Sequence, residues 1–169
     1  MSETIVNRVA KSSIITIDLS EVYPKHKKFE IDISKWLYEG FILKEKEFRD
    51  SLKNTDWSNY NDSYVALYCS TDAIIPAWAY MLISTYLNPM THKVIVGREI
   101  DLVALLFEDA ITKMDISSYK DKPVIVKGCS DVKIPETAYL SLIKKLQPVV
   151  KSLMFGEACS AVPLYKPRK

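Results

Sequence analysis

The chain has 169 residues, of which 48% are hydrophobic and 26% are charged, and its formal net charge is +2. This balance is typical of a globular protein and predicts a single domain, 1–169, large enough to bury a core. The small net charge argues against nucleic-acid and membrane-surface partners. The N-terminal residues show no signal-peptide pattern and no apolar run is long enough to span a membrane, so we expect a cytoplasmic protein.

Two β-rich segments come first in the chain, 13–19 (SIITIDL) and 28–33 (KFEIDI). We expect both segments to be strands that pair as a hairpin at the edge of a sheet. The segment that follows, 34–40, resembles a weaker version of the short strands predicted further along. The lysine-rich stretches 24–28 and 166–169 are predicted to be a solvated loop and a solvated tail.

The segments 48–97 and 107–156 resemble each other when the sequence is shifted by 59 residues. The shared patterns are Asp-x-Ser-x-Tyr-x-Asp at 56–62 and 115–121, and Ile-Pro-x-x-Ala-Tyr at 75–80 and 134–139. Self-similarity of this kind predicts an internal duplication.

Each copy predicts the order helix–strand–helix–strand, from helical spacing of apolar residues, β-rich runs and proline positions. The predicted segments of the two copies are helices at 45–54 and 100–114, strands at 64–69 and 123–129, helices opened by Pro76 and Pro135, and strands ending at Gly97 and Gly156. Such alternation predicts an α/β fold with a mostly parallel or mixed sheet. The predicted boundaries are 1–40 for the N-terminal strands and helix, 41–97 and 98–156 for the two modules, and 157–169 for the tail.

The three cysteines, Cys69, Cys129 and Cys159, are each followed by a serine. Cys69 and Cys129 end predicted strands and Cys159 lies three residues beyond one, and the strands of a parallel sheet all end at the same edge. That edge is where α/β sheets bind their ligands, so we expect the three cysteines to gather there.

Three thiolates form a soft site that suits Zn²⁺ or an iron–sulfur cluster. Six neighbouring residues are expected to support such a site. The serines would donate hydrogen bonds to sulfur and the acidic residues could provide a fourth ligand, and they are Ser70, Ser130, Ser160, Asp72, Asp131 and Glu157. The leading hypothesis is therefore a protein that binds a metal ion or an iron–sulfur cluster through three cysteines.

Two other hypotheses stay open, because the cysteines form no Cys-x-x-Cys pair and free cysteines often only pack in cores. The first is a thiol-dependent transferase or redox enzyme in which Cys69 or Cys129 is the nucleophile at a helix N-terminus. The second is a homodimeric interaction module in which the cysteines are buried and do no chemistry.

The two histidines are not predicted to join this site. His92 precedes the predicted strand at 93–97, which places it at the sheet edge opposite the cysteines. His26 lies in the basic loop, where we expect it to be exposed. The repeated aspartates suit turn capping better than a hard-metal site, since each precedes a predicted strand, and they are Asp56, Asp62, Asp115 and Asp121.

Several phrases of the sequence are similar to an uncharacterised family of bacterial proteins, the domain of unknown function numbered 2480. They include DWSNYNDSYVALYCSTDAIIPAWAYML, KGCSDVKIP and FGEACSAVPLYK, and the resemblance covers nearly the whole chain. The resemblance implies no activity. It implies a genomic neighbourhood with iron–sulfur assembly genes, which favours iron–sulfur assembly proteins as partners and a cluster at the cysteines.

Overall fold

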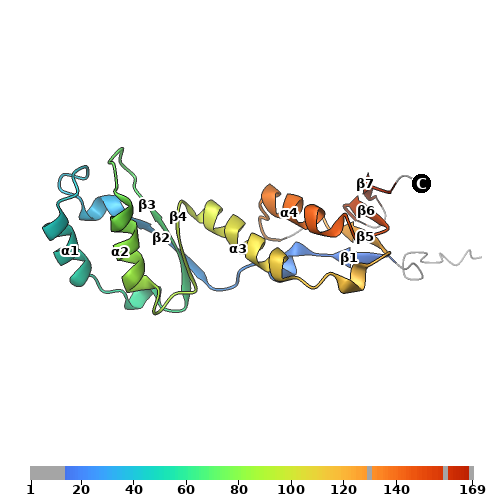
Figure 1. The fold of residues 1–169 in the computed structure, drawn as a ribbon, viewed down its shortest axis with the longest axis horizontal. Helices are drawn as coiled ribbons and strands as arrows, with labels where there is room; N and C mark the ends of the chain where they lie inside the picture. Colours follow the sequence, from blue (N-terminus) through green and yellow to red (C-terminus); the bar gives the residue numbers. More distant parts are fainter. Residues whose placement is uncertain (1–13, 129–130, 158–159, 168–169) are drawn as a thin grey trace, which may run out of the picture. The chain divides into compact units, whose positions relative to one another are not determined.

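A computed structural model describes residues 14–128, 131–157 and 160–167. The chain forms two compact units, one made of 25–105 and the other of 1–24 together with 106–169 (Figure 1). We call them the central unit and the terminal unit. The fold contains both helices and parallel strands, which confirms the predicted α/β class, while the prediction of one domain stays a prediction.

The central unit is a three-stranded parallel sheet in the order β2-β3-β4, with helices between the strands. Its elements are β2 (Lys27–Asp32), α1 (Glu45–Lys53), β3 (Ser63–Tyr68), α2 (Ala77–Leu87) and β4 (Lys93–Val96). Side chains alternate along a strand, so Phe29, Val65 and Val94, which are paired in register, share one face of the sheet. The helices pack on this face.

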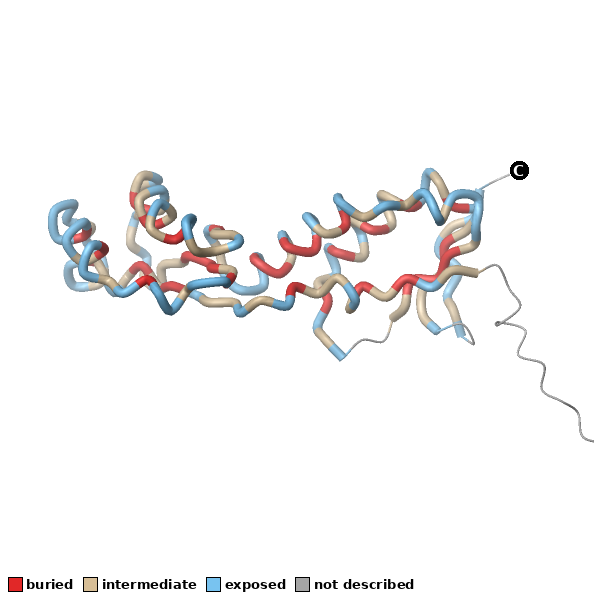
Figure 2. Tube along the Cα trace, turned by 90° about the horizontal axis from the view of Figure 1, so that it is seen from below, coloured by how far each residue is buried: buried red, intermediate tan, exposed pale blue. Residues whose placement is uncertain are grey.

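Aromatic side chains fill the core between this sheet and its helices. Phe48 is fully buried and meets Trp36 and Trp78 edge-on, with ring centroids 6.1 and 5.9 Å apart. Trp57 stacks on Tyr86 at 5.4 Å. These rings belong to the hydrophobic core between the sheet and its helices. Figure 2 shows buried segments along the chain of this unit.

The terminal unit contains a four-stranded sheet in the order β1-β5-β6-β7. The first three strands are parallel and β7 is antiparallel to β6. Its elements are β1 (Ile15–Ile17), β5 (Pro123–Val126), α4 (Glu136–Leu146), β6 (Ser152–Phe155) and β7 (Val162–Tyr165), and α3 (Glu99–Lys113) contributes residues to both units. Strand β7 lies within the segment 157–169, which the sequence assigned to the tail, and the predicted boundaries stay a prediction.

Apart from β7, the terminal unit repeats the element order of the central unit, and two pairs of elements lie at the predicted offset. Helices α2 and α4, and strands β4 and β6, are separated by 59 residues (136 − 77 and 152 − 93). Asp62 and Asp121 both have positive φ, as do Gly97 and Gly156. Shared order does not establish common descent, so the internal duplication stays a prediction.

The predicted N-terminal hairpin is wrong. β1 pairs with β5 and β2 pairs with β3, both parallel, so the two segments lie in different sheets. Each of these strands ends at an aspartate, Asp18 or Asp32, whose carboxylate accepts the N–H of a serine two residues on and starts a 3₁₀ helix. The chain is thereby turned away from the strand instead of returning in a hairpin.

The segment 34–40 is not a strand. Ile33–Trp36 is a 3₁₀ helix, and Glu39 and Gly40 form a tight turn with φ of 50° and 77°. Within the described ranges, no helix is both long and apolar enough to cross a lipid bilayer.

Candidate functional site

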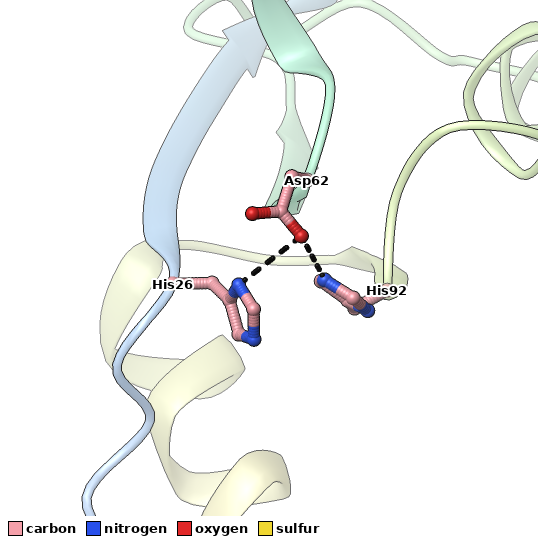
Figure 3. A group of neighbouring side chains, drawn as sticks. All are labelled: His26, Asp62 and His92. Atoms are coloured by element: carbon pink, nitrogen blue, oxygen red, sulfur yellow. Dashed lines mark hydrogen bonds and ion pairs between the residues drawn. The ribbon is translucent and has the colours of Figure 1, made fainter.

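The two histidines and one aspartate meet at one edge of the central sheet (Figure 3). His26, Asp62 and His92 each stand directly before the first residue of a strand, β2, β3 and β4 respectively. Because the three strands are parallel and adjacent, their N-terminal ends lie side by side. The topology of the sheet therefore brings together three residues that are far apart in the sequence.

Both imidazole rings point at the same carboxylate oxygen. His92 Nε2 lies 2.7 Å and His26 Nδ1 lies 3.3 Å from Asp62 Oδ1. The ring centroids of the two histidines are 4.1 Å apart. The side chains stay accessible, with exposed fractions of 39% for His26, 69% for Asp62 and 45% for His92.

The backbone around Asp62 fixes the direction of its side chain. Asp62 has φ of 55°, in the left-handed region that aspartate tolerates better than most residues. Its N–H donates to Met90 O at 2.9 Å, and the N–H of His92 donates to Ser63 O at 2.8 Å. These two bonds tie the entrance of β3 to the entrance of β4, so Asp62 and His92 are held next to each other.

The terminal unit has the same turn without the histidine. Asp121 has φ of 57°, and its N–H donates to Val149 O at 2.9 Å. Lys151, whose N–H donates to Lys122 O, occupies the place of His92. Both units thus have an aspartate with a left-handed backbone at this turn, and the central unit differs by having histidines beside it.

Tyr64 supports both imidazole rings from the sheet. Its ring centroid lies 5.5 Å from that of His26, edge-on at 90°, and 5.7 Å from that of His92. Tyr64 lies in β3, two residues after Asp62. The Tyr64 ring therefore packs against both imidazole rings.

The carboxylate of Asp62 is held in its charged form. The hydrogen bond from His92 lowers its pKa most, desolvation opposes this, and His26 lowers the pKa further. A charged carboxylate beside two imidazole nitrogens is a ligand set that suits Zn²⁺ and related divalent transition metals. The three ligand atoms lie within 4.8 Å of one another, and a tetrahedral ion with bonds of ~2.1 Å needs neighbouring ligand atoms about 3.4 Å apart.

The prediction for His92 is confirmed, since it lies at the edge where the strands begin, but its contact with His26 and Asp62 was not predicted. His26 was expected only to be exposed, because it was assigned to the basic loop 24–28, ahead of the strand predicted at 28–33. The available signal was that His26, Asp62 and His92 each precede a β-rich run. Parallel pairing of all three runs would have predicted their convergence.

The strands that precede the three cysteines belong to two sheets. Cys69 follows β3 of the central unit, while β5 and β6, which precede Cys129 and Cys159 in the sequence, belong to the terminal unit. One shared sheet edge therefore does not account for a site that includes Cys69. Cys129, Ser130 and Cys159 lie outside the described residues, and the three-cysteine site stays a prediction.

Cys69 is half-buried against the core of the central unit, and its Sγ lies 3.3 Å from Thr71 Oγ1. The Thr71 hydroxyl also donates to Gly40 O at 2.6 Å. Thr71 therefore contacts both Cys69 and the backbone of the turn at Gly40. The role of Cys69 as a nucleophile stays a prediction.

The other predicted supporting residues make local contacts. The N–H of Ser70 donates to Asp32 Oδ1 at 3.1 Å, and the Ser70 and Ser34 hydroxyls lie 3.1 Å apart. Burial raises the pKa of Asp32, but hydrogen bonds from Ser70 and Ser34 outweigh it and bring the pKa to about 2. The remaining predicted residues are at the surface, namely Asp72, Asp131, Glu157 and Ser160.

Residues 3–167 match the sequence model of a family described as "Protein of unknown function (DUF2480)". No curated protein and no solved structure matches the chain.

Proposed function

Since the chain belongs to the DUF2480 family of proteins of unknown function, we propose its function from its site: it binds a divalent transition-metal ion of the Zn²⁺ class through His26, Asp62 and His92. The observation that carries this proposal is that the two histidines of the chain converge on one carboxylate oxygen. Aromatic packing by Tyr64 and two backbone bonds hold the ligands in place before any ion binds.

The ligand types decide the class of ion. Imidazole nitrogen suits Zn²⁺, Ni²⁺, Cu²⁺ and Fe²⁺, whereas Mg²⁺ and Ca²⁺ prefer sites made entirely of oxygen. A structural zinc site is usually closed by four protein ligands, and catalytic zinc sites keep one position for water or substrate. Three accessible ligands therefore favour an ion with at least one exchangeable position.

The test measures metal binding by the full-length protein with isothermal titration calorimetry. We expect one Zn²⁺ per chain, and we expect Asp62→Asn or His92→Gln to weaken binding at least tenfold. Asparagine also tolerates the left-handed backbone of residue 62, so the loss of Zn²⁺ affinity in Asp62→Asn measures the contribution of the carboxylate charge. The matched control is Asp121→Asn at the equivalent turn of the terminal unit, which should leave Zn²⁺ binding unchanged.

Equal binding by wild type and Asp62→Asn would refute the proposal. Cys69→Ala separates it from the three-cysteine hypothesis, because that variant should keep the ion if the histidines hold it and release the ion if the cysteines do. The zinc or iron–sulfur site at the cysteines, the thiol enzyme, the iron–sulfur assembly partners and the homodimer stay predictions.

A further inference from the structure

We infer that the exchangeable position of the metal takes a phosphate group, so that the site binds a phosphate-bearing ligand. This inference rests on the proposed metal centre and names the class of ligand that the centre would hold. Negative and positive charge are unevenly distributed around the site. The cluster contains one carboxylate, whereas lysines lie next to the histidines in the sequence.

The lysines are attached next to the ligands. Lys25 and Lys27 flank His26 and are both exposed, and Lys93 follows His92. Consecutive Cα atoms are 3.8 Å apart, so these side chains originate within about half a Debye length of the ligands at physiological salt. An anion at the metal is therefore attracted by the ion and by the surrounding lysines together.

The sheet also places positive charge on the face that carries the cluster. Lys28 and Lys93 are the register partners of Tyr64 on its two sides. Partners in register share a face of the sheet, and Tyr64 is in ring contact with both histidines. The row Lys28–Tyr64–Lys93 thus runs across the sheet on the same side as the imidazole rings.

A phosphate fits this environment better than a carboxylate or a polyanion. A phosphate monoester carries close to two negative charges and several acceptor oxygens, whereas a carboxylate carries one charge. Lysine binds phosphate as a compact point charge. The net charge of the whole chain is only +2, so it offers no long basic track for a nucleic acid.

The experiment uses full-length protein loaded with Co²⁺, whose visible absorption reports the ligands of the ion. Inorganic phosphate is titrated into the protein at low salt, and acetate is titrated in parallel to compare a carboxylate ligand. We expect phosphate to shift the bands with a saturable dependence and acetate to do so much more weakly. The double variant Lys25→Gln/Lys27→Gln should bind Co²⁺ normally but raise the Kd for phosphate about fivefold.

The matched control is Lys120→Gln/Lys122→Gln, which removes two exposed lysines beside Asp121 in the terminal unit and should leave the phosphate Kd unchanged. Bands that stay constant, bands that vanish because phosphate strips the ion, or equal responses to acetate would each overturn the inference while the metal centre stands. An unchanged Kd in Lys25→Gln/Lys27→Gln would overturn it as well. Failure of Co²⁺ to bind would overturn the metal centre and this inference with it.

Discussion

Individual aspartates do several different jobs in this protein. Asp56 and Asp115 accept the N–H of a serine two residues on, each at 2.9 Å, as the turn-capping prediction expected. Asp62 adopts a left-handed backbone and turns its carboxylate to the two histidines. Aspartates of the same repeated pattern thus form turns at one position and provide a candidate metal ligand at another. The sequence pattern alone does not distinguish these two roles.

Asp18 forms an ion pair and two hydrogen bonds in the terminal unit. Lys127 Nζ donates to its Oδ2 at 2.8 Å, and the Ser20 N–H and hydroxyl both donate to its Oδ1. The hydrogen bond from Lys127 lowers the pKa of Asp18 most, followed by those from Ser20, and the result is a pKa of about 2. The Asp18 side chain is 16% exposed, so much of this interaction is shielded from solvent.

We predict that Asp18→Asn lowers the free energy of unfolding by about 1–2 kcal/mol at pH 7. The folded pKa of about 2 lies below the ordinary value of 3.8, so the stabilisation is present above pH 3.8 and is lost as the pH falls toward 2. Asparagine still caps the 3₁₀ helix, so the change isolates the charge. Urea unfolding between pH 2 and pH 7 should show wild type and variant converging at the acid end, and a constant difference would contradict the assignment.

At the scale of elements, strands β4 and β6 each end where a glycine redirects the chain. Gly97 follows β4 with φ of 144°, and Gly156 follows β6 with φ of 115°. A Cβ at Gly97 would lie 2.7 Å from Asp101 Oδ2, which accepts the N–H of Arg98 at the start of α3. A Cβ at Gly156 would meet its nearest atom at 3.5 Å.

We therefore predict that Gly97→Ala destabilises more than Gly156→Ala. Both variants place a side chain in a backbone region that favours glycine, which costs about 1–3 kcal/mol. Gly97→Ala must in addition displace Asp101 and its hydrogen bond, which adds about 1 kcal/mol. The free energies of unfolding in urea measure the difference, and equal losses would show that the contact with Asp101 relaxes at no cost.

Most elements of the fold were predictable from local patterns. Helical spacing and the Ile-Pro steps located α2 and α4, and β-rich runs located β3 and β5. The pairing of β1 and β2 was not predictable from local sequence, because a strand's partner is chosen by packing among all strands. Strand β7 was missed since its residues, Val-Pro-Leu-Tyr, are mostly exposed and include a proline.

At the scale of the whole molecule, the candidate metal site lies within one of the two units. The central unit carries His26, Asp62 and His92, while the terminal unit repeats the turn with Asp121 and Lys151. An ion at the site would join the entrances of β2, β3 and β4. Binding should therefore stabilise one unit selectively.

We predict that Zn²⁺ slows amide hydrogen exchange in 25–30, 61–66 and 90–96, and leaves 120–126 and 150–155 unchanged. At a free Zn²⁺ concentration of 100 times Kd, ligand binding stabilises the bound state by about 2.7 kcal/mol, which bounds the gain in protection. Hydrogen exchange with mass spectrometry measures both units in one sample. Equal protection of the two units, or protection that persists in Asp62→Asn, would contradict a site confined to the central unit.

By itself, the sequence determined the α/β class, the order and approximate bounds of most helices and inner strands, and the matching turns 59 residues apart. These depend on periodicity and on the backbone preferences of proline, glycine and aspartate, which act over a few residues. Only the tertiary structure decided that the strands form two sheets and that His26, Asp62 and His92 meet. Those features depend on which strands lie side by side, and hydrogen bonds and core packing between distant segments fix that choice.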